Sequence, residues 1–145
     1  MDIKIKNPGD LNGLRDRTLP NMELRSGSAA AHPAGGVRCH VLVCVGSGCV
    51  ASGSLEVSAA FEKAIVKHRL ANEIKVVGTG CLGPCAAGPV AAIYPEGVLY
   101  EALKPEDAGE IVARHLAKGQ AVERLVHKAP KTGTAVPKLK EVAYF

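Results

Sequence analysis

The sequence predicts an α+β fold in which a four-stranded mixed sheet is covered by two helices. Three observations in this chain of 145 residues support the prediction. Four short runs rich in strand-forming residues are bounded by glycine, proline or asparagine. Two longer segments, residues 54–70 and 105–118, have apolar side chains at helical spacing. The order is strand, helix, strand, strand, strand, helix, which joins a strand–helix–strand unit to a hairpin and a last helix.

The first predicted strand and helix follow directly from their side-chain patterns. Residues 37–45 read VRCHVLVCV, in which four of the five alternate positions are the β-branched residue valine and the fifth is Cys39. A helix is expected from Ser54 to Leu70, because Ser54 can cap it and Glu56 lies in the first turn, where the helix dipole favours an anion. Its buried face is predicted to hold five side chains: Val57, Phe61, Ala64, Ile65 and His68.

The rest of the sheet is predicted at residues 74–79, 90–94 and 98–100. The last two strands are joined by Pro95-Glu96-Gly97, a hairpin signal. The second helix is expected to begin at Pro105 and to end before Gly119. These elements have the order of a thioredoxin-type sandwich. In such folds a cis-proline often lies just before the strand that corresponds to residues 90–94. Pro89 occupies this place here, and both the cis and the trans isomer are open for it.

Weaker signals flank the predicted domain. Residues 1–36 are predicted to be a helical preface with a linker, residues 37–126 the folded domain, and residues 127–145 a second linker. Most of the net charge of +4 lies in the flanks, because residues 39–118 carry seven basic and eight acidic side chains. Nucleic-acid-binding domains carry a basic stripe with interleaved aromatics, and no such stripe is visible. We expect no nucleic-acid partner.

The cellular compartment is predicted from what the sequence lacks. No apolar run approaches the ~18 residues that a membrane-spanning helix needs. The first residues, MDIKIKNPGD, lack the apolar stretch of a secretory signal. Five cysteines, an odd number, argue against a disulfide framework. We therefore expect a cytoplasmic protein without a membrane span.

Four of the five cysteines form two pairs embedded in glycine. Cys44 and Cys49 lie in CVGSGC, Cys81 and Cys85 lie in GTGCLGPC, and thirty-one residues separate the pairs. Each pair begins at the carboxyl end of a predicted strand, where open α/β sheets hold ligands. Thiolates at short spacing are typical ligands of soft metal centres. The four cysteines are therefore candidate ligands of a metal centre.

Three chemistries are open to such cysteines. Structural zinc uses pairs separated by two to four residues, so the spacing permits it, although zinc usually staples domains too small to fold alone. Thiol–disulfide exchange uses a pair with two residues between the cysteines, whereas these pairs hold four and three. A 2Fe–2S cluster takes four thiolates, and this is the interpretation we favour.

The remaining candidate residues have structural explanations. Cys39 falls on the alternating pattern of the first strand and is expected to be a buried structural thiol. His40 would matter in a Rieske centre, where two His replace two Cys, but neither cysteine pair is followed by a suitable His. His68 and His115 are expected to be packing or boundary residues on helices, and His127 falls in a predicted linker.

The stretch 41–125 resembles the thioredoxin-like 2Fe–2S ferredoxins. It is particularly similar to the N-terminal domain on the flavin-bearing (beta) subunit of NADH-dependent and electron-bifurcating hydrogenases, and to related NADH dehydrogenase subunits. The segments HVLVCVGSGCVASGS, GTGCLGPCAAGPVAAIYPEGVLY and EDAGEIVARHLAKGQAVERLV match that domain in order and spacing. The resemblance implies that Cys44, Cys49, Cys81 and Cys85 bind a 2Fe–2S cluster.

The resemblance also implies a role as a one-electron relay in a multi-subunit NADH-linked oxidoreductase or hydrogenase. The implied partners are flavin- and NAD-binding and other iron–sulfur subunits, and residues 127–145 would lead towards a flavin domain. This sequence has no glycine-rich dinucleotide fingerprint, so we expect no catalytic site of its own. The alternatives are a free-standing thioredoxin-like ferredoxin and a zinc-stapled docking module without redox activity. Assembly into a homo-oligomer is also open.

Backbone donors are expected to tune such a cluster. With four thiolates, an oxidised 2Fe–2S centre carries a charge of about −2, and reduction adds one more negative charge. The N–H groups of residues 46–48 and 82–83 are candidate donors to the sulfurs, which would raise the reduction potential. The positive end of the helix that starts near Ser54 is expected to point towards the first pair.

Overall fold

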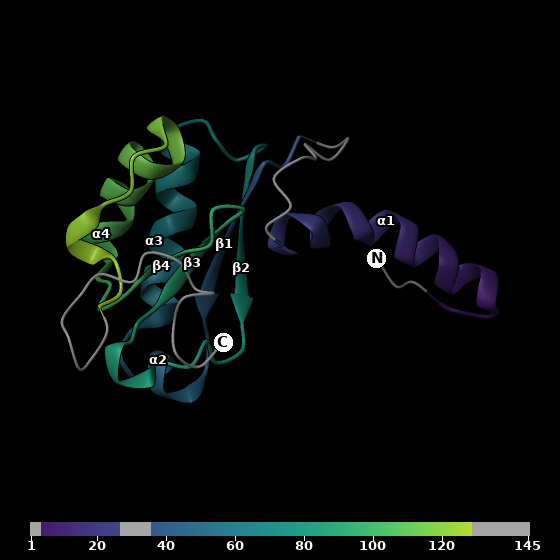
Figure 1. The fold of residues 1–145 in the computed structure, drawn as a ribbon, viewed down its shortest axis with the longest axis horizontal. Coiled ribbons are helices and arrows are strands. Elements are labelled where there is room, and N and C mark those ends of the chain that lie inside the picture. Colours follow the sequence, from purple (N-terminus) through teal and green to yellow (C-terminus); the bar gives the residue numbers. More distant parts are fainter. Residues whose placement is uncertain (1–3, 27–35, 129–145) are drawn as a thin grey trace.

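A computed structural model describes residues 4–26 and 36–128 of the chain (Figure 1). Its centre is a four-stranded mixed sheet with the strand order β2-β1-β3-β4. The strands are β1 (Cys39–Cys44), β2 (Ile74–Thr79), β3 (Ala91–Tyr94) and β4 (Val98–Tyr100). Strand β1 pairs in parallel with β2 and antiparallel with β3. The predicted fold class is confirmed.

Helices occupy both the predicted places and some that the sequence did not indicate. The helices are α1 (Pro8–Ser26), α2 (Ser47–Ala51), α3 (Ser54–Lys67) and α4 (Pro105–Ile111). Helix α4 continues without a break as a π-helical segment, η2 (Val112–Leu116), and two 3-10 turns are present, η1 (Cys85–Ala87) and η3 (Glu123–Leu125). Within the described residues, no helix is both long and apolar enough to cross a membrane.

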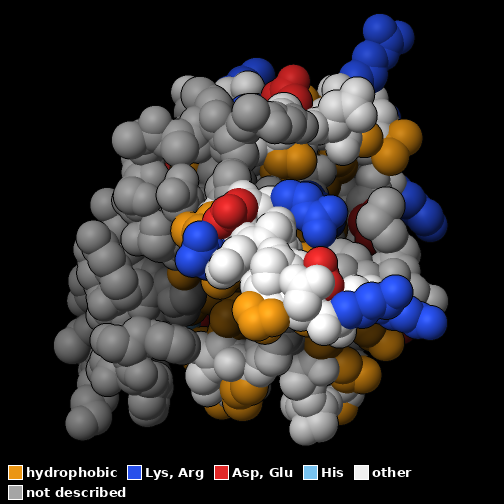
Figure 2. Space-filling view, turned by 90° about the vertical axis from the view of Figure 1, so that its right-hand side faces the viewer, with side chains coloured by type: hydrophobic (Ala, Val, Ile, Leu, Met, Phe, Trp, Pro, Cys, Tyr) orange, Lys and Arg blue, Asp and Glu red, His pale blue; other side chains and the backbone are white. Residues whose placement is uncertain are grey.

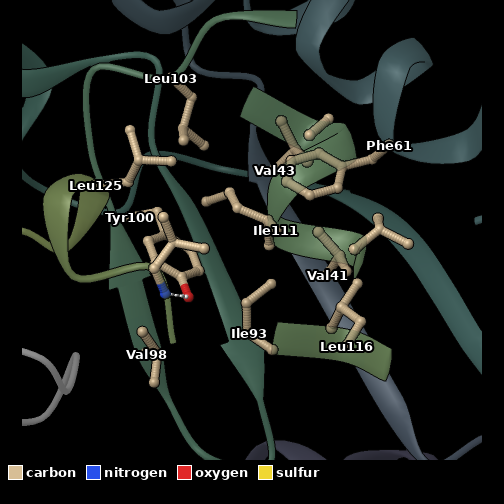
Figure 3. Close-up of a cluster of buried hydrophobic side chains, with 14 of the residues drawn as sticks. Val41, Val43, Phe61, Ile93, Val98, Tyr100, Leu103, Ile111, Leu116 and Leu125 are labelled. Atoms are coloured by element: carbon tan, nitrogen blue, oxygen red, sulfur yellow. Dashed lines mark hydrogen bonds between the residues drawn. The ribbon is translucent and has the colours of Figure 1, made fainter. Parts of the chain in front are cut away.

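The main core lies between one face of the sheet and helices α3 and α4 (Figure 3). Val41 and Val43 point into it from β1, because alternate residues of a strand face the same side. Phe61 of α3 and Ile111 of α4 are fully buried against them. Fully burying a side chain of this size contributes roughly 1.5–3 kcal/mol. This face of the sheet therefore supplies most of the hydrophobic stabilisation.

A second, smaller core lies on the opposite face of the sheet. Leu42 and Cys44 point into it from β1, and Ala92 and Leu99 contribute from β3 and β4. Among the described helices, α1, α3 and α4 contribute no residue to this core. Cys49 of α2 and Leu82, which follows β2, pack on it instead. The loops that carry the cysteine pairs are therefore the cover of this second face.

The predicted element boundaries agree with the structure to within a few residues. Strands 74–79 and 98–100 are confirmed as predicted, while β1 is shorter than residues 37–45 and β3 begins one residue after the predicted start. The helical preface is confirmed as α1, with Leu11 and Leu19 exposed. The linker at residues 27–35 and all but the first two residues of the linker at 127–145 lie outside the described residues. The Gly88–Pro89 peptide bond is cis.

Three local features differ from the sequence-based expectation. Residues 47–51, for which no helix was predicted, form helix α2. Ser54 does not cap α3: Gly53 is the N-cap residue, and the buried Ser54 hydroxyl has no hydrogen-bond partner. His68 lies just past the end of α3 and is exposed, so it is a boundary residue and not part of the buried face.

The chain after η2 packs back onto the sheet. Val122 and Leu125 are buried in the main core, and Val126 forms an isolated antiparallel bridge with Tyr100 of β4. His127 is also buried, and its Nδ1 bonds to the carboxylate of Glu101 at 2.5 Å. This segment covers the edge of β4, which would otherwise present unpaired backbone groups.

Surface charges are mixed on the side of the molecule turned to the viewer in Figure 2. Lys and Arg side chains are interspersed there with Asp, Glu and hydrophobic side chains (Figure 2). On that face the described residues do not form the basic stripe that nucleic-acid binding would need.

We predict that Tyr100→Phe destabilises the protein by about 1–3 kcal/mol, because it leaves two buried groups without a partner. The Tyr100 hydroxyl bonds to Nδ1 of His115 at 2.7 Å and accepts the N–H of Val122 at 3.1 Å. Urea unfolding followed by circular dichroism measures the change. Tyr94→Phe is the control, since Tyr94 is only partly buried. Equal stability of the two variants would contradict the prediction.

Candidate metal centre

The two cysteine pairs are brought together by the parallel pairing of β1 and β2. In this register Cys44, the last residue of β1, lies opposite Thr79, the last residue of β2. The pairing continues one step further, with the N–H of Val45 donating to the carbonyl of Thr79 at 2.9 Å. Parallel strands that end level with each other deliver their following loops to the same edge. Cys81 therefore emerges next to Cys44, as the sequence predicted.

The four sulfurs form a chain of neighbours from Cys49 to Cys85. The Sγ atoms of Cys81 and Cys85 are 3.2 Å apart. The Cys44 thiol interacts with Cys49 on one side and with Cys81 on the other, so it links the two pairs. In residues 4–26 and 36–128, no group of three or more His, Cys, Asp or Glu side chains has the geometry of a single-ion site. The contacts between the sulfurs therefore run from Cys49 through Cys44 and Cys81 to Cys85.

The two pairs differ in exposure. Cys44 and Cys49 are 1% and 2% exposed, at the base of the second core. Cys81 and Cys85 are exposed. A group held between the pairs would thus be shielded by protein on the first pair's side and open towards solvent on the second pair's side.

Glycines permit the close approach of the loops. A Cβ at Gly46 would lie 3.5 Å from the Cys44 sulfur and 3.5 Å from Cα of Cys81, so this residue sits where the two loops meet. Gly83, which lies between Cys81 and Cys85, has a φ of +106°, a backbone conformation that residues with a side chain rarely adopt. That turn places the Gly83 N–H 3.4 Å from the Cys81 sulfur. Donation from Gly83 confirms one of the predicted backbone donors.

The thiols have different protonation preferences. Burial raises the pKa of the Cys49 thiol to about 11. A hydrogen bond with Cys85, and then the N–H of Gly83, lower the pKa of the exposed Cys81 thiol. The same contact raises the pKa of Cys85. The Cys81 thiolate is therefore easier to form than the thiolates of Cys49 and Cys85, and thiolates are the form in which cysteines bind metals.

The segments around the sulfurs carry no charged side chain. Residues 41–55 and 76–95 contain no Asp, Glu, Lys or Arg. Backbone N–H groups are the donors that the structure places at the sulfurs: Gly83 donates to Cys81, and Val90 donates to Cys49. The Val90 donor was not predicted, because it belongs to the start of the third strand and reaches Cys49 only through the packing of the second core. The all-sulfur donor set suits a soft metal centre.

Cys39 lies apart from this group. It is at the other end of β1 from Cys44, five residues or roughly 17 Å along the strand. Its side chain points into the main core, whereas Cys44 points into the second core. Burial raises the pKa of Cys39 to about 12. The expected structural role of Cys39 is confirmed.

The histidines contribute to packing in ways that the sequence signalled only in part. His115 is 5% exposed, as expected for a packing residue, and burial lowers its pKa. His127, to which the sequence gave no role, is buried beside Glu101. His40 is buried on the strand that carries Cys44. His127 could have been found only from its neighbours, the apolar residues of AVERLV, which mark a segment that packs.

Comparisons with known proteins agree on one family. The family described as thioredoxin-like 2Fe-2S ferredoxin matches residues 30–116. A 2Fe-2S ferredoxin of Aquifex aeolicus is 45% identical over 97 residues, which is 60% of this chain and 86% of that protein. One of Clostridium pasteurianum is 38% identical over 77 residues, 53% of this chain and 76% of that protein.

A solved structure gives the same result. The crystal structure of the wild-type thioredoxin-like 2Fe-2S ferredoxin from Aquifex aeolicus superposes with a TM-score of 0.58 and 41% identity. The superposition covers 63% of this chain and 97% of that one. The order of strands and helices described above is therefore shared with a known ferredoxin.

We predict that Cys39 resists alkylation in the folded protein, while Cys81 and Cys85 react first once metal is removed with a chelator. Cys39 is buried, and its pKa of about 12 leaves almost no thiolate at mildly alkaline pH. Peptide mass spectrometry after iodoacetamide treatment reads each site. Urea-unfolded protein, in which all five cysteines react, is the control. Alkylation of Cys39 as fast as Cys81 in the folded state would contradict the prediction.

Proposed function

The chain belongs to the family of thioredoxin-like 2Fe–2S ferredoxins, which bind a 2Fe–2S cluster and transfer electrons, and we propose that Cys44, Cys49, Cys81 and Cys85 are its cluster ligands. The observation that carries this assignment is the chain of neighbouring sulfurs at the edge where β1 and β2 end. A 2Fe–2S cluster takes four thiolates. The segments that carry these four sulfurs, residues 41–55 and 76–95, contain no His, Asp or Glu.

The residues present fit such a cluster better than a single zinc ion. Zinc in a structural site is surrounded by four ligands at about 2.0–2.3 Å, which requires all four sulfurs to converge on one point. The sulfurs here follow one another in a chain from Cys49 through Cys44 and Cys81 to Cys85, and such an extended arrangement suits a centre with two metal ions. The zinc-stapled docking module is therefore the weaker hypothesis.

The bound cluster supplies a one-electron couple, and the protein sets its surroundings. Cys44 and Cys49 lie in the second core, which keeps water away from their side of the centre. The N–H groups of Gly83 and Val90 donate to the Cys81 and Cys49 sulfurs, and such donors stabilise the extra negative charge of the reduced state. Electrons enter and leave past Cys81 and Cys85, whose side is open to solvent.

We infer that the chain acts as a free-standing electron carrier of the cytoplasm. Support comes from its relatives, which are named as ferredoxins and are matched over most of their own length. A relay role in a multi-subunit NADH-linked oxidoreductase or hydrogenase, with flavin- and NAD-binding partners, is the second candidate. Support for it is the match of three segments to the domain on the flavin-bearing subunit. The two roles predict different results on purification. A free-standing carrier purifies alone, whereas a relay of a multi-subunit complex purifies with a flavoprotein.

The ligand assignment is tested by replacing each cysteine with serine in the full chain. We predict that Cys44, Cys49, Cys81 and Cys85 variants each lose the cluster or change its visible absorption and the EPR spectrum of the reduced state, because an oxygen ligand replaces a thiolate. Cys39→Ala is the matched control and should keep both spectra, since Cys39 faces the other core. An unchanged spectrum for any of the four, or an altered spectrum for Cys39→Ala, would refute the assignment.

A further inference from the structure

Gly88 lies between the second cysteine pair and β3, just after the turn η1. Its φ of −67° and ψ of 160° are extended backbone that any residue adopts. Glycine is therefore not needed here for its conformational freedom. The atoms that surround Gly88 therefore explain why this residue has no side chain.

A side chain at Gly88 would clash with the sulfur of Cys49 and would lie tightly against the carbonyl of Cys85. A Cβ there would lie 2.9 Å from the sulfur of Cys49 and 3.3 Å from the carbonyl oxygen of Cys85. Non-bonded carbon atoms prefer separations of about 3.5–4.0 Å, and sulfur is larger than carbon. The bare Cα of Gly88 thus fills the gap between a residue of the first loop and a residue of the second.

The Cys49 sulfur has little room to move away. The Cys49 side chain is 2% exposed, and its sulfur accepts the N–H of Val90, two residues beyond Gly88. The backbone on both sides of Gly88 is also held in place. The N–H of Ala102 donates to the carbonyl of Ala87 at 2.7 Å, and the next N–H along donates to the carbonyl of Pro89 at 3.1 Å. An added methyl group would therefore displace the Cys49 sulfur or break this clamp.

We propose that Gly88 is a positioning residue for the cluster: its missing side chain lets the Cys49 sulfur rest on the backbone after Cys85 and so sets the spacing of the two cysteine pairs. The inference rests on the proposed function, since it takes Cys49 and Cys85 as ligands. It goes beyond that function by assigning a role to a residue that cannot itself bind metal. The residue acts only through the sulfur that it accommodates.

The test compares Gly88→Ala with Gly80→Ala in the full chain, purified anaerobically with its cluster. Gly80 is a matched control, because it adjoins Cys81 and a Cβ there would meet nothing within 4 Å. We expect Gly88→Ala to shift the EPR g values of the reduced protein and to lose its visible absorption in air roughly tenfold faster than the parent, as overpacking predicts. Gly80→Ala should match the parent. The same spectrum and lifetime for both variants would overturn the proposal.

A double-mutant cycle decides the case in which Gly88→Ala takes up no cluster. The thermal midpoint is measured for Gly88→Ala in the parent chain and in a Cys49→Ala background. We expect Gly88→Ala to lower the midpoint in the parent and to lower it much less when the Cys49 sulfur is gone. An equal lowering in both backgrounds would overturn the proposal.

Failure of the proposed function has a different signature. If Cys49→Ser left the cluster spectra unchanged, Cys49 would not be a ligand. The ligand assignment would then be wrong, whatever Gly88→Ala showed. If Cys49→Ser altered the spectra while Gly88→Ala behaved as Gly80→Ala does, the ligand assignment would stand and only the positioning role would be lost.

Discussion

The parallel pairing of β1 with β2 is the constraint on which the centre depends. It places Cys44 opposite Thr79, so that thiols separated by thirty-one residues of sequence emerge at one edge of the sheet. Ordering two loops around four sulfurs costs conformational entropy. That cost is met elsewhere, because α3, the connection between the two strands, buries Phe61 and Val57 in the main core. The register of one strand pair thus links the stability of the fold to the geometry of the site.

The two faces of the sheet have different roles, one in the stability of the fold and the other in the proposed metal centre. The face covered by α3 and α4 holds the larger core and the buried Cys39. The opposite face holds the smaller core, which includes Cys44 and Cys49. The period of two along β1 separates these roles, since odd-numbered residues face the helices and even-numbered residues face the cysteine loops. One cysteine of the same strand is a packing residue for this reason, and another lies at the proposed metal centre.

The sequence predicted the parts of this structure that depend on local pattern. Alternating valines located β1, and glycine-flanked cysteines after two strands located the centre. The parts that it did not predict depend on contacts distant in sequence. Gly46 and Gly48 gave no sign of α2, the helix that contains Cys49, and the helical pattern of residues 105–118 gave no sign of the π-helical segment. The packing of the chain around His127 depends on Glu101 and β4, which no local pattern reveals.

The central claim is that these four thiols hold one two-iron cluster. Anaerobic iron, zinc and acid-labile sulfide analysis of the purified full chain tests it most directly, together with EPR before and after reduction. The account predicts two irons and two sulfides per chain, no zinc, and an EPR signal only in the one-electron-reduced state. One zinc per chain without sulfide, in a colourless protein, would contradict it.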